Sequence, residues 1–149
     1  MPDLKTLVKR TIEGLGQDFK QARADLNVII AEIRDAIRES TTPEFKLYLS
    51  PVREDAQGEV SNLVVEIAET KRDIGAYRIS PSGYPIEYGV QAAAFGGFEL
   101  MGAVADKDEL LAHFAEMVSN PGSPLMVFVT YHWRKQKDLK TNSEETVQD

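Results

Sequence analysis

The side chains in this 149-residue chain best suited to proton transfer at neutral pH are its two histidines. His132 follows an apolar run and stands between Tyr131 and Trp133, where an imidazole could act as a general base. Because no serine stands in a nucleophile-elbow motif and no nearby carboxylate orients the ring, we favour a strand-end histidine with a backbone or water partner. The alternative is a cofactor-free enzyme with His132 as the base. Tyr131, Tyr88 or Glu87 would then have to assist it in one pocket.

Metal and nucleotide chemistry have little support in the sequence. The chain has no cysteine, which excludes disulfides and thiolate metal sites, and neither His113 nor His132 belongs to a His-Glu-x-x-His pattern. The acidic run 106–109 lacks the glycine and the distal glutamate of an EF-hand loop, and capping explains acids in the first turn of a helix. No glycine group has the spacing of a dinucleotide-binding motif or a P-loop. We expect no metal and no cofactor.

Charge divides the chain into three parts. Residues 1–40 carry seven acidic and seven basic side chains, residues 41–133 carry thirteen acidic and six basic, and residues 134–149 carry four of each. The whole formal charge of −7 therefore lies in the middle region. An acidic body repels nucleic-acid phosphates and attracts basic surfaces. We expect a protein partner with a basic surface.

Residues 131–140 begin Tyr-His-Trp-Arg-Lys and mix aromatic with basic side chains. Such a composition can stack on bases and neutralise phosphates, so a weak nucleic-acid contact here is a further alternative. The acidic body and the four acids of the terminal segment argue against nucleic acid. A solvated charged surface is the interpretation we favour.

Two tyrosines near a proline-bounded turn, Tyr84 and Tyr88, stand on either side of Glu87. Exposed tyrosines are good anchors in protein interfaces. Tyrosine is also common in strands, so a structural role is the simpler interpretation. We keep Tyr84, Glu87 and Tyr88 as candidate protein-binding residues.

A long N-terminal helix should position the rest of the chain. Over residues 3–40, nine apolar residues recur at alternating intervals of four and three: Val8, Ile12, Leu15, Phe19, Ala22, Leu26, Ile29, Ile33 and Ala36. This is a heptad seam, typical of a coiled coil. Pro43 should end the helix. Gly14 and Gly16 could bend it, but the seam passes through them in phase, which favours a continuous or gently bent helix.

The seam widens in its second half, where Ile30 and Ile37 add another apolar column. A broad apolar face suits a sheet, and a narrow one suits another helix. We therefore expect the second half to cover the body and the first half to meet the same helix of a second copy. The predicted contacts of this homo-oligomer are Val8, Ile12, Leu15, Phe19 and Ala22. Left exposed in a monomer, they would form an apolar stripe of a kind that soluble proteins avoid.

The middle of the chain is expected to be mostly strand. Alternating apolar and polar residues predict four strands over 45–50, 62–67, 76–80 and 86–90. A polar loop is expected at 54–59, and further turns join the strands into an antiparallel meander. Residues 91–105, which are mostly small and apolar, receive no assignment.

The last third should contain a helix and a strand. Asp106, with Glu109 three residues later, predicts the start of a helix over 106–119. The mainly apolar run from Leu125 to Tyr131 predicts a central strand covered on both faces. Residues 134–149 are expected to form a polar, disordered tail. The predicted fold is α+β: helix 1–40 and helix 106–119 pack on a mainly antiparallel sheet of about five strands, with the sheet domain over 41–133.

Location and function follow from these patterns. No apolar run approaches the ~20 residues of a membrane span, and the first residues do not resemble a secretory signal. We therefore expect a cytoplasmic protein with no membrane contact. We expect an oligomeric, non-catalytic protein-binding or adaptor module whose acidic sheet domain engages a basic protein partner.

Overall fold

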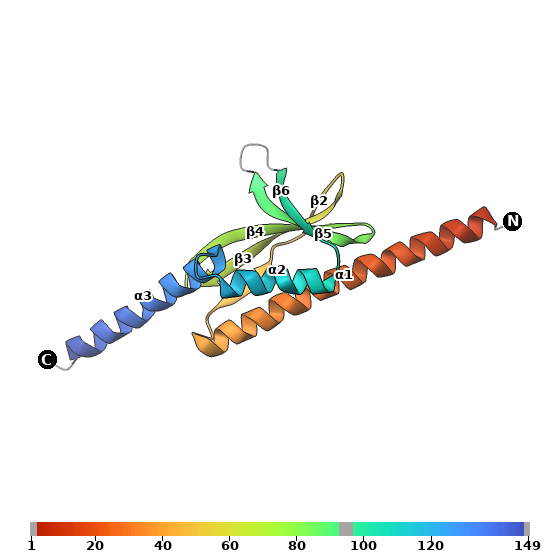
Figure 1. Ribbon diagram of the computed structural model, residues 1–149. Coiled ribbons are helices and arrows are strands. Elements are labelled where there is room, and N and C mark those ends of the chain that lie inside the picture. Colours follow the sequence, from red (N-terminus) through yellow and green to blue (C-terminus); the bar gives the residue numbers. More distant parts are fainter. Residues whose placement is uncertain (1–2, 93–96, 148–149) are drawn as a thin grey trace.

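The computed structural model describes residues 3–92 and 97–147 and has an α+β fold, as the sequence predicts (Figure 1). Three helices form: α1 (Leu4–Ser40), α2 (Lys107–Ser119) and α3 (Pro124–Val147). Six strands form: β1 (Lys46–Leu49), β2 (Arg53–Asp55), β3 (Gly58–Ile67), β4 (Thr70–Ser80), β5 (Gly83–Ala92) and β6 (Gly97–Val104).

The strands make one open sheet in the order β1-β3-β4-β5-β6, with β2 also paired to β3. Every strand pair is antiparallel, which confirms the predicted meander. The segment 54–59, predicted to be a polar loop, instead forms the short β2–β3 hairpin, and most of 91–105 belongs to the β5–β6 hairpin. Residues 93–96 lie outside the described residues.

The hydrophobic core lies between one face of the sheet and the helices. Alternate residues of the strands point to this face, among them Leu63, Val65 and Tyr77. Helices α1 and α2 lie across it and contact each other (Figure 1). The helix predicted over 106–119 is confirmed: Asp106 is the N-cap of α2, and its side chain accepts a hydrogen bond from the Glu109 N–H at 2.9 Å.

The prediction of a strand at Leu125–Tyr131 is wrong, because this segment is the first part of α3. Its buried residues, Leu125, Phe128 and Val129, are spaced by three and one, which fits one face of a helix. The Ser123 hydroxyl accepts a hydrogen bond from the Met126 N–H at 3.2 Å, and a proline follows Ser123 at the first helical position. His132 is therefore a helix residue, and α3 continues through 134–147, where the sequence predicts a polar tail.

Helix α1 is continuous through Gly14 and Gly16, as the phase of the seam predicts. The Asp3 side chain caps its first turn by accepting a hydrogen bond from the Lys5 N–H at 3.2 Å. Ala22, Leu26, Ile29 and Ile30 are buried, so the second half of α1 covers the sheet as predicted. The first half extends beyond the sheet (Figure 1).

No helix within residues 3–92 and 97–147 combines the length and the apolar character needed to cross a bilayer.

Candidate functional site: the arm of α1 and the cleft at its base

The most unusual surface of the molecule is the projecting first half of α1, residues 4–18, which we call the arm (Figure 1). Three of the predicted contact residues lie exposed on it: Val8 at 55%, Ile12 at 65% and Leu15 at 38%. Leu4 and Leu7 are also exposed: Leu4 flanks the seam toward the N-terminus, whereas Leu7 lies outside the seam. Soluble monomers rarely leave such a continuous apolar stripe in water.

The other two predicted contact residues do not belong to this free surface. Phe19 is half-buried against the core, and Ala22 is completely buried. The body of the protein meets α1 at Asp18, where the β4–β5 turn approaches the helix. A Cβ atom on Gly83 would lie 2.5 Å from the Asp18 carbonyl oxygen, and Gly83 has φ +84°, so only glycine fits this contact without strain. The predicted interface therefore ends near Phe19 because the chain's own sheet covers the seam beyond it.

A cleft of about 420 Å³ opens where the arm joins the body, and we call it the base cleft. Gly16 and Phe19 of α1 line one side of it. Ile79 and Pro81 add apolar surface, and the β2–β3 hairpin adds three carboxylates, Glu54, Asp55 and Glu59. The base cleft thus combines an apolar lining with an acidic rim, which suits a side chain with an apolar stem and a cationic end.

Two of the three carboxylates have cationic partners within the chain. Asp55 accepts a hydrogen bond from Arg78 at 3.0 Å, and Glu59 pairs with Arg23 at 3.3 Å. Burial raises the pKa of the Asp55 carboxyl, but hydrogen bonds from the Gln57 N–H and from Arg78 outweigh that effect and lower the pKa below its usual value. The Asp55 carboxylate is therefore ionised at neutral pH.

The Asp55–Arg78 pair belongs to a network on the face of the sheet opposite the core. Arg78 is nearly buried, donates to Glu87 at 2.9 Å and lies 4.6 Å from the centre of the Phe98 ring. Glu87, predicted as a protein-binding residue, is thus half-buried and held in an internal ion pair.

Tyr84 and Tyr88, the other two predicted surface anchors, are also half-buried against the core. The Tyr84 hydroxyl donates to the Asp25 carboxylate of α1 at 2.9 Å. Burial and this hydrogen bond raise the pKa of Tyr84. Each of the three predicted residues of this segment therefore has an internal partner, and a role of theirs in protein binding stays a prediction.

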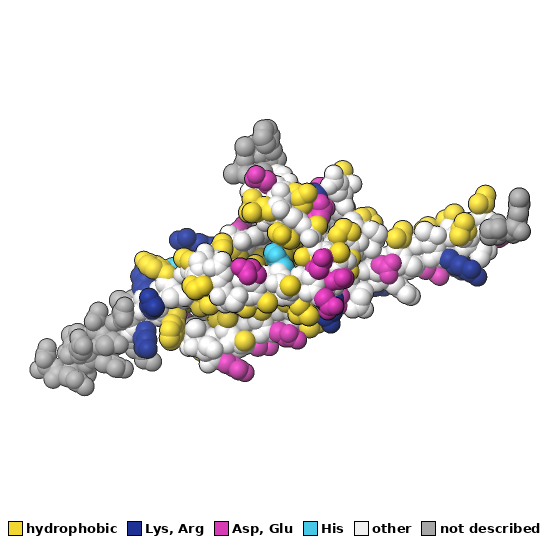
Figure 2. All heavy atoms as spheres, in the orientation of Figure 1, with side chains coloured by type: hydrophobic (Ala, Val, Ile, Leu, Met, Phe, Trp, Pro, Cys, Tyr) yellow, Lys and Arg dark blue, Asp and Glu magenta, His cyan; other side chains and the backbone are white. Residues whose placement is uncertain are grey.

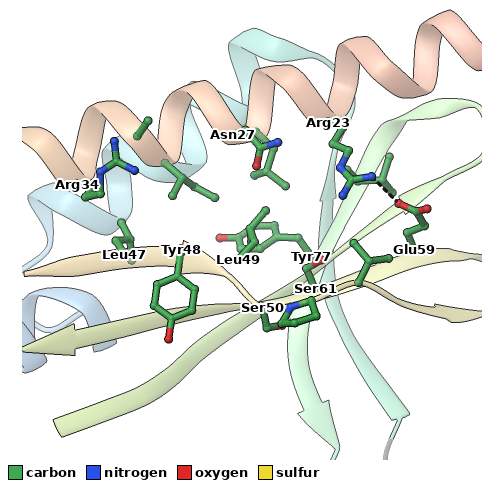
Figure 3. Close-up of a pocket in the computed structure, with 16 residues that line it drawn as sticks. Arg23, Asn27, Arg34, Leu47, Tyr48, Leu49, Ser50, Glu59, Ser61 and Tyr77 are labelled. Atoms are coloured by element: carbon green, nitrogen blue, oxygen red, sulfur yellow. Dashed lines mark hydrogen bonds and ion pairs between the residues drawn. The ribbon is translucent and has the colours of Figure 1, made fainter. Parts of the chain in front are cut away.

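A second groove, of about 470 Å³, runs between the second half of α1 and β1 (Figure 3). Arg23 and Arg34 stand on its helix side, Tyr48 and Ser50 on its strand side, and Tyr77 contributes to the lining. Arg23 is paired with Glu59, as the dashed line in Figure 3 shows, and Arg34 with Asp35 at 3.1 Å. No sequence pattern pointed to this groove, because its walls come from segments far apart in the chain.

His132 lines a cleft of about 440 Å³ together with Arg72, Asp73 and Tyr131. Its ring packs on Phe128 with 4.3 Å between the centroids. Partial burial lowers the pKa of His132, and the positive charges of Arg72 and Lys135 lower it further. The histidine is therefore mostly neutral at pH 7 and able to accept a proton.

Tyr88 and Glu87, which the enzyme hypothesis would bring to His132, do not line its cleft. Tyr88 instead packs against the other histidine, with 4.3 Å between its ring centroid and that of His113. The structure thus places Tyr131 beside His132 and directs Tyr88 and Glu87 elsewhere.

His113 of α2 pairs with Tyr77 of β4, whose hydroxyl lies 2.8 Å from the His113 Nε2. Burial lowers the pKa of His113 and raises that of Tyr77, so both groups are neutral at pH 7 and the hydroxyl can donate to the ring nitrogen. The sequence places His113 on the predicted helix 106–119, but sequence spacing could not reveal a tyrosine 36 residues away as its partner.

Among residues 3–92 and 97–147, no three histidine, aspartate or glutamate side chains lie close enough together to hold a metal ion. Among the predicted nucleic-acid contact residues 131–140, the side chains of Tyr131, Trp133, Arg134, Lys135 and Lys137 lie along α3, where the Lys137 ammonium stands 5.1 Å from the centre of the Trp133 ring. Comparison of the chain with protein-family models, curated proteins and solved structures finds no match.

Proposed function

We propose that this protein is a non-catalytic protein-binding module that self-associates through the arm and offers its acidic body to a basic partner protein. The observation that carries the proposal is the exposed apolar seam of the arm, with Ile12 65% accessible at its centre. Complete burial of one side chain of this size contributes about 1.5–3 kcal/mol, and the arm presents several in a row. A partner helix is the element that covers a narrow apolar stripe best.

The charge distribution supports the second half of the proposal. Residues 41–133 carry the whole net charge of −7, while residues 1–40 are neutral overall. Acidic side chains are visible around the place where α1 leaves the body (Figure 2). Such a field attracts basic surfaces over a range of about 10 Å at moderate ionic strength.

Sedimentation equilibrium of the wild type, Ile12→Glu and Val28→Glu tests self-association. Ile12 and Val28 are both exposed apolar residues of α1, at 65% and 51%, but Val28 lies outside the heptad seam. We expect the wild type and Val28→Glu to exceed the monomer mass of 16.6 kDa, and Ile12→Glu to sediment as a monomer. A wild type that stays monomeric at high concentration would contradict the proposal.

Binding of a basic peptide tests the role of the acidic body. A fluorescent peptide rich in lysine and arginine should bind at low salt and dissociate as salt increases, because screening weakens exposed charge attractions. A peptide of the same length in which glutamate replaces each basic residue is the control. Capture of the acidic peptide, or binding of the basic peptide that is indifferent to salt, would argue against this mode of recognition.

A second candidate function is catalysis without a cofactor, with His132 as the base. The observation in its favour is the position of a neutral His132 in a cleft beside Asp73 and Tyr131. Hydrolysis of activated esters by the wild type and by His132→Ala tests it. Equal rates for the two proteins would dismiss the candidate.

A further inference from the structure

The two halves of α1 share one apolar seam, but only the first half of that seam is free. From Ala22 onward the seam faces the chain's own sheet, and the body begins to contact the helix at Asp18. A second helix running parallel on the same seam would have to continue through the space that the sheet occupies. An antiparallel helix avoids this collision, because the first arm projects away from its own sheet (Figure 1) and the body of the second copy would lie beyond the free end of that arm.

The extent of the free seam also fixes the register of an antiparallel pair. In the heptad with Ile12 at position a, Val8 and Leu15 are d positions, and antiparallel helices place a residues opposite d residues. If Val8 lies opposite Ile12 of the second copy, Leu15 lies opposite Lys5. The first helical residue, Leu4, then lies level with Gly16, so each helix ends just before the body of the other.

The flanks of the arm agree with this arrangement. Positions a and e are adjacent on a helix, so Lys5 at a and Lys9 at e lie on the same side of the seam as Gly16 and Phe19, which line the base cleft. In an antiparallel pair, the two-fold axis is perpendicular to the plane that contains the two helices. The side of the seam with positions a and e in one copy therefore lies on the same side of the pair as the corresponding side in the other copy. The second copy therefore presents Lys5 to the cleft whose rim carries Glu54, Asp55 and Glu59.

Charge and space at the contact are complementary. Residues 3–10 carry three basic side chains against one acidic one, and Figure 2 shows basic side chains toward the free end of the arm. A Cβ atom on Gly16 would meet nothing within 4 Å, so open space lies above the helix at the entrance to the cleft. The aliphatic stem of a lysine can occupy such an opening while its ammonium reaches the carboxylates.

We propose that two copies of this chain pair through antiparallel arms, with Val8 of one opposite Ile12 of the other, and that Lys5 of each copy seats in the acidic base cleft of the other. This proposal rests on the proposed self-association and adds to it the orientation, the register and the second site. Each base cleft is complete only when the second copy supplies its first helical turn.

Disulfide trapping tests the orientation, because the natural chain has no cysteine. Lys5→Cys and Leu15→Cys are both changes at exposed positions that should leave the fold intact. Mixed and mildly oxidised, the two variants should form a disulfide-linked heterodimer. Each variant alone should not, since an antiparallel pair separates its two copies of residue 5, or of residue 15, by ten residues, about 15 Å along the axis. Homodimers of each variant without the heterodimer would overturn the proposal in favour of parallel arms.

A charge exchange tests the base cleft. Lys5→Glu should weaken the dimer by about four- to twenty-fivefold at low salt, because the pair loses two exposed ion pairs of about two- to fivefold each, and Glu54→Lys should restore it in the double variant. Arg10→Glu makes the same change of charge at heptad position f, on the outer side of the arm, and should have little effect. Equal weakening by Lys5→Glu and Arg10→Glu, or no recovery in the double variant, would refute the seating of Lys5.

The outcomes separate the two proposals. A monomeric wild type refutes self-association and this inference together. A dimer that Ile12→Glu dissociates, but that links cysteines in the parallel pattern or ignores the charge exchange, leaves the proposed function standing and overturns the antiparallel arrangement alone.

Discussion

The two halves of α1 have the same heptad seam and meet opposite environments. In the second half, Leu26 and Ile30 are almost completely buried under the sheet, while in the first half Ile12 and Val8 remain more than half exposed. The seam residues alone do not predict which half of α1 is buried. The additional apolar column at Ile30 and Ile37 distinguishes the second half, because it makes the apolar face wide enough to pack on a sheet. The comparison shows that the width of an apolar face, more than its period, indicates what will cover it.

Truncation of one seam residue in each half should give the largest contrast. Leu26→Ala removes a side chain that is 1% exposed and should lower the free energy of unfolding by about 2–5 kcal/mol. Ile12→Ala in the arm should change it by less than about 0.5 kcal/mol in dilute solution, where the arm is free. Urea denaturation of both variants at low protein concentration measures the difference. Similar losses would mean that the arm folds back against the body.

Substitutions of two glycines, one in the arm and one where the β4–β5 turn contacts α1, test the same difference between free and packed surface at the backbone. Gly83→Ala forces a Cβ against the Asp18 carbonyl at φ +84°, so it should destabilise the protein by about 1–3 kcal/mol. Gly14→Ala adds a Cβ where nothing lies within 4 Å and should stabilise the helix by about 1 kcal/mol. Thermal unfolding followed by circular dichroism should therefore show shifts of opposite sign. A neutral Gly83→Ala would mean that α1 and the β4–β5 turn do not meet in solution.

The smallest expected effect is the pH dependence of the free energy of unfolding that His113 of α2 contributes. Burial lowers the pKa of His113 below its unfolded value of about 6.5, so the folded state binds fewer protons than the unfolded state as the pH falls. The stability that depends on neutral His113 is present above pH ~6.5 and is lost as the pH falls through the lower pKa of the folded state. His113→Gln cannot titrate, so its stability should decline less between pH 7 and pH 5 than that of the wild type.

Urea denaturation at each pH measures this difference, and effects common to both proteins, such as the protonation of carboxylates, cancel. Parallel pH profiles for the wild type and His113→Gln would show that His113 is solvated in the native protein.

The sequence predicted the features that depend on local pattern. The continuous α1, the cap at Asp106 and the strands of the meander follow from periods and capping residues that neighbours along the chain set. The segment Leu125–Tyr131 could not be assigned from its period, because residues 125–129 are all apolar and a consecutive apolar run fits a buried strand and a buried helix equally. Ser123 and Pro124 were the available signals of a helix start, and they outweigh β-propensity in this structure.

The candidate site was predictable only in part. The exposed arm follows from the narrow seam, but the base cleft joins residues of α1, the β2–β3 hairpin and the end of β4. Sequence spacing gives no information about such a meeting of distant segments. The pairing of His113 with Tyr77 was hidden for the same reason, since it depends on how α2 lies across the sheet.

The unbroken course of α1 has a mechanical consequence. Helix α1 has 37 residues and is about 55 Å long. It carries both the exposed seam of the arm and the buried seam that packs on the sheet, so the angle between these two surfaces is fixed. Inserting a single residue near Gly16 would rotate the exposed seam of the arm by about 100° relative to the body. The second half of α1 would still pack on the sheet. The number of residues between the two halves of α1 therefore sets the direction in which the exposed seam of the arm faces.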